Sequence, residues 1–306
     1  MSTVTDPRVS VLISTSDRPE TLERCLRSVL SQTYENFEVL VLDNSPHLDS
    51  CIQLDDEFSD DRLQCTHIDE SRGVAGSRNW LMNEANGDVY IVIDDDAKFE
   101  SDDAVENIVA GFHDDVGIQA FKIVDHPDNE SDHILAPVPQ SQADKIDFDE
   151  SFKASYYVGG GHAIKREVIE QCGYYNDDLM YGHEELDLSY RTIESGFKIE
   201  YNPEIVVHHY PEPPVINTNT VGRPEFYYEL RNRLYLGYRY LPLKYLVSYF
   251  LVWIGYYAFV SMKSFSPDEF ISALVDGIRF CTDVDRDPIS SSAERYLKHN
   301  HGRLWY

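Results

Sequence analysis

The chain has 306 residues, of which 42% are hydrophobic, so it is long enough to bury the core of one large domain, or of one domain with an appendage. It carries 54 acidic and 26 basic residues, a formal net charge of −28, which argues against nucleic acid as a partner because binding to strand phosphates needs clustered cations. Such a surface keeps a protein soluble where salt screens its self-repulsion, and we therefore expect a salt-accumulating, halophilic source.

The first hundred residues alternate between strand and helix patterns. Apolar, β-branched runs predict strands at 9–14, 37–42, 63–68 and 89–93. Between them, one-sided apolar spacing predicts a helix that opens at Pro19 and another that begins near Ala75 and closes at Asn86-Gly87. This βαβ order predicts an α/β fold with an open, mostly parallel sheet flanked by helices. Ligands of such sheets bind beyond the carboxyl ends of the strands.

The middle of the chain is less regular. Residues 125–150 are polar, contain proline and lack sustained periodicity, so we expect a long loop on the substrate side. A compact region follows at 156–209, with helices expected to begin at Lys165 and at Glu184.

The last third of the chain is rich in aromatic residues, and residues 245–262 form an uncharged run bracketed by two lysines. As a helix at about 1.5 Å per residue it would be roughly 27 Å long, near the lower limit for a membrane span. Tyr245, Tyr249 and Tyr256 would share one face, which favours a helix at the membrane surface over a true span. A buried packing helix is the alternative.

Three aspartates, Asp94, Asp95 and Asp96, directly follow the apolar strand 89–93. Adjacent carboxylates at the end of a buried strand repel one another unless a positive charge lies between them. Hard oxygen ligands suit Mg²⁺ or Mn²⁺, which bind through one or two carboxylates together with substrate phosphates. The alternative is a solvated turn, and the buried strand favours the metal site.

Glu184 and Glu185 follow Gly182 and open a segment with helical apolar spacing. A carboxylate in this position could act as the base for an attacking hydroxyl group. Acids in the first turn of a helix also stabilise its N-terminus without any catalytic role. The pair alone does not decide between these interpretations.

The five cysteines are scattered, odd in number and free of any Cys-x-x-Cys spacing, so we expect them to be reduced in an intracellular protein. Residues 1–8 are short and polar and do not resemble a cleaved signal. The catalytic part is therefore expected to stay in the cytoplasm.

Five segments, taken in order, resemble the family 2 glycosyltransferases of GT-A type over about two thirds of the chain. They are 9–19 (VSVLISTSDRP), 28–34 (SVLSQTY), 37–44 (FEVLVLDN), 73–79 (GVAGSRN) and 87–97 (GDVYIVIDDDA). The resemblance implies an inverting sugar transfer with Mg²⁺ or Mn²⁺. It divides the chain into a nucleotide-sugar-binding half at 1–97, an acceptor and catalytic half at 98–215, and a helical, membrane-associating region at 216–306.

The resemblance also implies donor-binding roles for five residues. Thr15 and Asp43 would hold the nucleoside, Arg78 would meet the diphosphate, and Asp94 would lie against the ribose, with Asp95 beside it.

Metal and acceptor roles follow in the same way. Asp96 would be the metal ligand, and His208 and His209 stand where some members place a histidine near the metal, although histidines at a strand end are as often ordinary polar residues. Gly160 and Gly161 match the small-residue loop that leaves room for donor sugar and acceptor, unless they form a simple tight turn.

The acidic pair matches the position at which the family carries its base. The segment reads Glu184-Glu185-Leu186-Asp187-Leu188, with Glu at the second position where the family usually has Asp. We expect Glu185 to be the base, with Glu184 as the second candidate.

Arg231-Asn232-Arg233 is similar to a subset of the family that acts on lipid-linked or cell-surface glycans, and these arginines could meet lipid phosphates. With the halophilic composition, this resembles haloarchaeal enzymes of lipid-linked N-glycan assembly. It implies transfer of a hexose or hexuronic acid from a nucleotide sugar to a dolichol phosphate-linked glycan, at the cytoplasmic face of the cell membrane, for surface-layer glycoproteins.

Two other functions remain open. A sugar nucleotidyltransferase shares the sheet architecture, but its glycine-rich loop after the first strand is missing, since residues 14–19 contain no glycine. A non-catalytic relative that serves as a membrane scaffold would explain the unusual Glu185.

Overall fold

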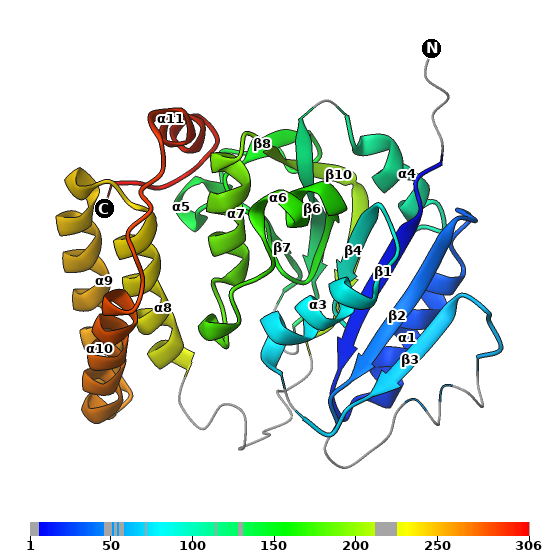
Figure 1. Ribbon diagram of the computed structural model, residues 1–306, viewed down its shortest axis with the longest axis horizontal. Helices are drawn as coiled ribbons and strands as arrows, with labels where there is room; N and C mark the ends of the chain where they lie inside the picture. Colours follow the sequence, from blue (N-terminus) through cyan, green and yellow to red (C-terminus); the bar gives the residue numbers. More distant parts are fainter. Residues whose placement is uncertain are drawn as a thin grey trace.

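The computed structural model describes residues 6–45, 51, 54, 58–70, 72–113, 115–127, 131–211 and 225–305. Within these ranges the strands join into one sheet (Figure 1). The strands are β1 (Val9–Thr15), β2 (Phe37–Asp43), β3 (Leu63–His67), β4 (Val89–Ile93), β5 (Ala97–Phe99), β6 (Val116–Asp125), β7 (His133–Leu135), β8 (Phe152–Ala154), β9 (Gly161–Lys165) and β10 (Lys198–His209).

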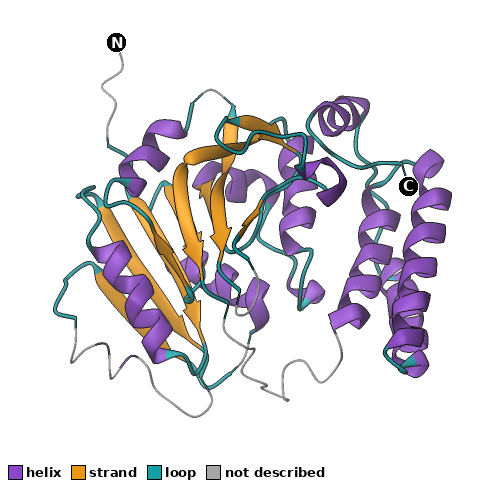
Figure 2. Ribbon diagram, turned by 180° about the vertical axis from the view of Figure 1, so that it is seen from behind, coloured by secondary structure: helices purple, strands orange, loops and turns teal. Residues whose placement is uncertain are grey.

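Helices cover both faces of this sheet, and a further group stands at one end of it (Figures 1 and 2). The described helices are α1 (Pro19–Leu30), α3 (Gly73–Glu84), α4 (Ala104–Gly111), α5 (Gln140–Ala143), α6 (Arg166–Cys172), α7 (Glu184–Glu194), α8 (Glu225–Tyr240), α9 (Leu243–Lys263), α10 (Pro267–Thr282) and α11 (Ser291–His299).

The strand order is β3-β2-β1-β4-β9-β6-β10-β5, with β7 paired to β6 and β8 paired to β10. Strands β1, β2, β3, β4, β6 and β10 run in one direction, and β9 lies antiparallel between β4 and β6. The expected α/β fold with a mostly parallel sheet flanked by helices is therefore confirmed. The six strands that share a direction bring their carboxyl ends to one edge of the sheet.

Alternation along the central strands explains the two helical layers. In β1, Leu12 belongs to the core beneath α3, α6 and α7, whereas Val11 and Ile13 belong to the core beneath α1 and α4. Because successive side chains of a strand point to opposite faces, a continuous apolar run such as β1 is buried on both sides.

Several elements were not expected from the sequence. Gly161, predicted to lie in a loop, begins β9, and the segment 97–125 holds β5, α4 and β6. Residues 125–150 are mainly loop, as predicted, but they include β7 and the single turn α5. Short strands of this kind owe their structure to pairing with neighbours, which local periodicity does not record.

The cysteine prediction was wrong for one pair. The structure joins Cys51 to Cys65 by a disulfide bond, which ties β3 to the segment that follows β2, while Cys25, Cys172 and Cys281 are free thiols. The irregular spacing of the cysteines did not reveal this pairing, because disulfide partners are set by proximity in the fold.

Helices α8, α9 and α10 lie side by side at the end of the sheet (Figure 1). In the described part of the chain, α9 is the one helix that is long and apolar enough, by length and composition, to cross a bilayer. The predicted tyrosine stripe does not form an exposed face: Tyr245 and Tyr249 are buried, and of the three only Tyr256 is exposed. Tyr245 and Tyr249 instead pack inward, because α9 has neighbouring helices to pack against.

Candidate active site

A cavity of about 600 Å³ lies at the sheet edge where the carboxyl ends meet. It is lined by 14–16 at the end of β1, by Asn44 after β2, by the triplet 94–96 after β4, by Gly159-Gly160 before β9, and by the start of α7. This is the position that the general rule for open α/β sheets predicts for a ligand. We call it the donor cleft.

Asp94, Asp96 and His209 bring their ligand atoms within 4.8 Å of one another, and they form the one such metal-binding group found among the described residues. His209 reaches this place because β10 ends at the same edge as β4, and because β5, which follows the triplet, pairs with β10 at Ala97 and His209. Two carboxylates and an imidazole form a donor set that fits a divalent cation.

The charges of this group depend on one another. Burial would raise the pKa of Asp96, but the hydrogen bond and charge of His209, together with Arg18, hold that pKa below its ordinary value. Burial opposes a proton on His209, yet its hydrogen bonds to Asp96 and Asp125 outweigh burial and raise its pKa to about 9. His209 therefore occupies, as an imidazolium, a place that attracts positive charge, and it must lose its proton to coordinate a metal.

Asp95 is not part of that group. Its carboxylate accepts a 2.6 Å hydrogen bond from the Thr15 hydroxyl and lies 3.4 Å from the Arg18 guanidinium. Burial raises the pKa of Asp95 to about 7. The hydroxyl of Thr15, which was predicted to hold the nucleoside, is thus engaged with Asp95, although Thr15 lines the cleft.

Arg78 connects the triplet to α7. Its guanidinium lies 3.6 Å from Asp94, 2.9 Å from Glu185 and 3.3 Å from Glu184. Although burial alone would lower its pKa, the carboxylates, led by Glu185, raise the pKa of Arg78 above its ordinary value. A buried cation among three carboxylates offsets repulsion that would otherwise destabilise the cleft.

The two glutamates differ in environment. Glu184 is buried, and within the described chain its Oε2 has no hydrogen-bond partner; burial and the neighbouring Glu185 raise its pKa well above the ordinary value. The side chain of Glu185 is 17% exposed and faces the cleft. Glu185 is the better placed of the two to accept a proton from a ligand.

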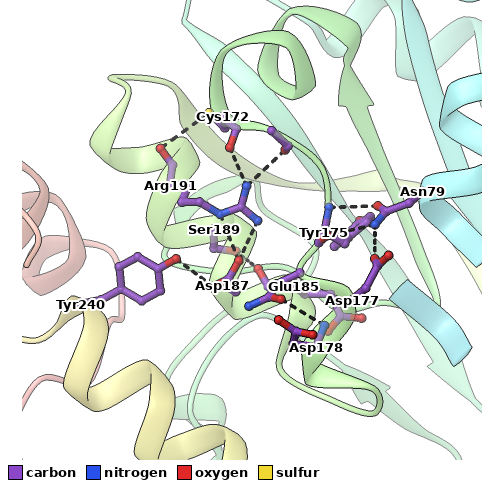
Figure 3. A network of polar contacts seen from close by, with 12 residues as sticks. Asn79, Cys172, Tyr175, Asp177, Asp178, Glu185, Asp187, Ser189, Arg191 and Tyr240 are labelled. Atoms are coloured by element: carbon purple, nitrogen blue, oxygen red, sulfur yellow. Dashed lines mark hydrogen bonds and ion pairs between the residues drawn. The ribbon is translucent and has the colours of Figure 1, made fainter. Parts of the chain in front are cut away.

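A polar network fixes the first turn of α7, as Figure 3 shows. The buried Asp187 accepts two hydrogen bonds from Arg191, at 2.6 and 3.0 Å, and one from the Tyr240 hydroxyl at 2.7 Å. Ser189 bonds the backbone oxygen of Glu185 at 2.6 Å. Asp187 therefore ties the turn that carries Glu185 to helix α8.

The backbone approaches the Glu185 and Arg78 side chains closely at Gly159, one residue before the predicted pair. A Cβ atom on Gly159 would lie 2.1 Å from Glu185 and 2.9 Å from Arg78, and one on Gly160 would lie 3.2 Å from Asp94. Gly161 instead packs in the core, where its Cβ would meet Phe121. Of the predicted pair, Gly160 lines the cleft together with Gly159, whereas Gly161 does not, and the acceptor role of Gly160 stays a prediction.

Two other predicted residues lie elsewhere. His208 faces the opposite side of β10 from His209, and its ring contacts His126 at 2.8 Å and Glu100 at 3.2 Å, so it is not part of the metal group. The prediction of His208 as a ligand is wrong because neighbouring strand residues alternate. Asp43 is fully buried against Ser45, and it is Asn44 that lines the cleft.

A second cavity, of about 720 Å³, shares Gly159 and Glu185 with the donor cleft. It runs under α7 toward α8, α9 and the residues that follow α11. Glu185 thus stands at the junction of two cavities, an arrangement that suits a base between two substrates. We call this second space the inner cavity.

Sequence reasoning missed Arg18, which pairs with Asp96 at 3.1 Å, and Asp125, which bonds His209. Arg18 belongs to the first motif quoted above, and its charge so close to a strand end was a usable signal. Asp125 ends the apolar run that forms β6, the same pattern that drew attention to the triplet.

Residues 10–173, more than half of the chain, match the family described as Glycosyl transferase family 2. An uncharacterised protein of Haemophilus influenzae is 26% identical over 171 residues, 54% of this chain and 91% of that protein.

Two relatives with described activities align over shorter stretches. The glucosyl-dolichyl phosphate glucuronosyltransferase of Haloferax volcanii is 38% identical over 99 residues, 31% of each chain. The Escherichia coli enzyme WfaP, a UDP-Glc:alpha-D-GlcNAc-diphosphoundecaprenol beta-1,3-glucosyltransferase, is 31% identical over 88 residues, 29% of this chain and 35% of the enzyme. The chain thus spans about a third of the length of these two relatives.

Solved structures share the fold. GalNAc-T7 with UDP, GalNAc and Mn²⁺ superposes with a TM-score of 0.58 at 17% identity, over 77% of this chain and 51% of that one. The mannosyltransferase PcManGT from Pyrobaculum calidifontis, in complex with GDP-Man and Mn²⁺, gives 0.54 at 18% identity, over 97% and 75%.

Proposed function

The chain belongs to glycosyl transferase family 2, and on that basis we propose that it transfers a sugar from a nucleotide-sugar donor to a hydroxyl group of an acceptor. The nucleotide diphosphate would occupy the donor cleft. The acceptor would reach the junction from the inner cavity.

The observation that carries this proposal is the position of Glu185 between the two cavities, across Arg78 from the group Asp94, Asp96 and His209. Sugar transfer from a diphosphate uses a base to deprotonate the acceptor and positive charge to stabilise the diphosphate. The cleft holds a candidate base, a buried cation and a candidate metal-binding group.

The chemistry follows from these positions. Glu185 takes the proton of the acceptor hydroxyl, and the acceptor oxygen attacks the anomeric carbon from the side opposite the diphosphate. The bond to the diphosphate breaks as the new bond forms, so the configuration inverts. Asp94, Asp96 and His209 would hold Mg²⁺ or Mn²⁺, which neutralises charge on the departing diphosphate when it is bound.

We extend the proposal to the acceptor and its location. The acceptor would be a dolichol phosphate-linked glycan, the sugar a hexose or hexuronic acid, and the site of action the cytoplasmic face of the cell membrane, in the N-glycosylation of surface-layer glycoproteins of a halophilic archaeon. The acidic composition and the similarity to the glucosyl-dolichyl phosphate glucuronosyltransferase of Haloferax volcanii support this pathway.

Membrane association is supported by the outer face of α9. Leu243, Val247, Leu251 and Met262 expose 73%, 69%, 72% and 65% of their surface, and Phe265 just beyond the helix exposes 92%. Large contiguous apolar patches on a soluble surface mark interaction sites. An interfacial helix would bury this face in the lipid headgroup region.

The function is tested by calorimetry with Mn²⁺ and UDP or GDP. We expect the wild-type protein to bind the nucleotide only when Mn²⁺ is present, and the double variant Asp94→Ala, Asp96→Ala to lose at least tenfold in affinity, because two of the three ligands are gone. The double variant Asp283→Ala, Asp285→Ala, which removes two exposed carboxylates outside the cleft, serves as the charge-matched control.

Undiminished binding by the double variant would refute the metal site. Release of pyrophosphate from a nucleoside triphosphate and a sugar phosphate would instead indicate a nucleotidyltransferase. Donor hydrolysis by the purified protein would exclude a purely scaffolding role.

A further inference from the structure

We propose that the inner cavity binds the head of an amphiphilic acceptor that carries a phosphate, and that the lipid chain of this acceptor leaves over helix α9. The inference deepens the proposed function and rests on it, because the inner cavity meets the donor cleft at Glu185. It assigns a binding role to the C-terminal helices and to the tail that follows them.

The walls of the inner cavity come from segments far apart in the chain. Ser155–Gly159 and the first half of α7 form one side, and Arg233 on α8, Trp253 on α9 and Gly302–Leu304 after α11 form the other. The C-terminal region therefore does more than pack against the catalytic domain: it closes a cavity that the catalytic domain alone leaves open.

Aromatic rings supply much of the surface. Tyr156, Tyr190 and Trp253 line the inner cavity. Flat rings give a sugar or an isoprenyl unit a large apolar contact with little loss of side-chain entropy. The Trp253 ring is also packed by the Arg233 guanidinium, 3.7 Å from its centre, which fixes its orientation.

The inner cavity is less acidic than the molecule as a whole. The chain has about two acids for every base, whereas this cavity is lined by two arginines, Arg233 and Arg303, and a single acid, Glu185. Arginine recognises phosphate through paired, charge-assisted hydrogen bonds. Arg233 pairs with Glu229 at 2.9 Å and stacks on Trp253, whereas Arg303 is an exposed residue of the tail after α11, so Arg303 is the arginine to substitute.

The two sides of helix α9 indicate where the lipid chain of the acceptor would lie. Its inner side carries Trp253 into the cavity wall, while Val247 and Leu251 on its outer side are 69% and 72% exposed. Ile271 and Ile278 on the neighbouring α10 are each 59% exposed and extend the apolar surface. One helix thus separates a cavity lined by two arginines from an apolar exterior, which is a layout that suits an amphiphile with a phosphate head.

The test measures binding of geranyl phosphate to the full-length protein by calorimetry, with geraniol and inorganic phosphate as separate probes. We expect geranyl phosphate to bind more tightly than either probe, since each offers half of the recognised chemistry. Arg303→Ala should lower the affinity for geranyl phosphate at least tenfold, and Arg303→Glu should lower this affinity further. Arg279→Ala, an exposed arginine of α10 outside the cavity, should leave it unchanged.

A second variant addresses the aromatic wall. Trp253→Leu should weaken geranyl phosphate and leave inorganic phosphate unaffected, because it removes ring surface and no charge. Equal binding of geraniol and geranyl phosphate, or full binding by Arg303→Glu, would overturn the phosphate assignment. Equal affinity for inorganic phosphate and geranyl phosphate would overturn the claim that the ligand is an amphiphile.

Binding of Mn²⁺ and nucleotide by the same variants separates the two proposals. If the Arg303 variants bind nucleotide normally and also bind geranyl phosphate as tightly as the wild-type protein, the acceptor cavity is refuted and the proposed function is not. Loss of the Mn²⁺-dependent nucleotide site in the wild-type protein would refute the proposed function itself.

Discussion

At the residue scale, the candidate site is a set of buried charges whose protonation states depend on their neighbours. Arg78 is surrounded by Asp94, Glu184 and Glu185, and His209 lies between Asp96 and Asp125. Removing one partner from such a set leaves an uncompensated charge, which costs more than the pair contributes. Substitutions that keep the shape of a side chain and change only its proton are therefore the informative ones.

The two glutamates are distinguished by substitution with glutamine. Glu185→Gln should lower kcat by roughly 10²–10⁴-fold, because a base is lost, while binding of Mn²⁺ and nucleotide stays within twofold. Glu184→Gln should cost less than tenfold, since burial already favours the neutral form of Glu184 and glutamine reproduces its shape. Steady-state kinetics with a nucleotide-sugar donor measure both, and a larger loss in Glu184→Gln would reverse the assignment.

We expect His183 to make the free energy of unfolding depend on pH. Burial lowers the pKa of His183 to about 4, below the ordinary 6.5, so the unfolded chain takes up this proton first as the pH falls. Wild-type stability should thus decrease between pH 6.5 and 4 by about 3 kcal/mol more than in His183→Asn, whose side chain does not titrate and tolerates the left-handed backbone at this position, where φ is 75°.

Urea unfolding of both proteins at several pH values measures this difference. The two curves should run parallel above pH 7, where His183 is neutral in both the folded and the unfolded chain. Parallel curves down to pH 4 would contradict the assignment.

At the element scale, α8 holds the segment that precedes α7. The side-chain amide of the buried Asn232 lies 2.9 Å from each of three backbone oxygens, those of Leu179, Tyr181 and Gly182. With the Tyr240 hydrogen bond to Asp187, this places the glutamate pair by contacts from the C-terminal region. Asn232 was noticed in the sequence only as the middle of an arginine motif, and its role is to position the backbone.

The outer face of α9 carries the proposed membrane contact. The double variant Val247→Ser, Leu251→Ser should fold normally, because both side chains are about 70% exposed, and should lose most of its co-sedimentation with phosphatidylglycerol vesicles at high salt. Tyr174→Ser, which changes an apolar residue 40% exposed outside α9, is the control. Equal sedimentation of the wild-type protein and the double variant would remove α9 from the contact.

At the scale of the whole molecule, the net charge of −28 opposes compaction. Charges separated by more than about 10 Å are screened from one another at 0.1 M salt, and this distance shrinks to about 3 Å at 1 M. Many of the ion pairs in the structure are exposed, as in Arg27 with Glu23, and contribute little. The balance between self-repulsion and screening is therefore a property of the entire surface.

Salt should stabilise the protein strongly. We expect Tm to rise by on the order of 5 °C or more between 0.1 M and 2 M KCl, as screening reduces the repulsion among acidic groups. Sucrose, which acts on burial without screening, provides the control. A Tm that responds equally to sucrose and to KCl would show that net charge is not the cause.

Local pattern predicted the fold class. The strands β1, β2 and β4 and the helices α1, α3 and α7 could be predicted, because buried parallel strands are continuous apolar runs and their ends are marked by polar residues. The same pattern marked the aspartate triplet as a candidate metal site, whereas the role of Glu185 is implied by the family resemblance, and both roles stay predictions.

The remaining features were decided by tertiary structure. Pairing across the sheet placed His209, and not His208, beside Asp96, and it put Asp125 behind it. Burial against neighbouring helices turned the tyrosines of α9 inward, and chain segments more than a hundred residues apart closed the inner cavity. Sequence records which residues are apolar and in what period, whereas contacts between distant strands and helices depend on the whole packing, which no local window contains.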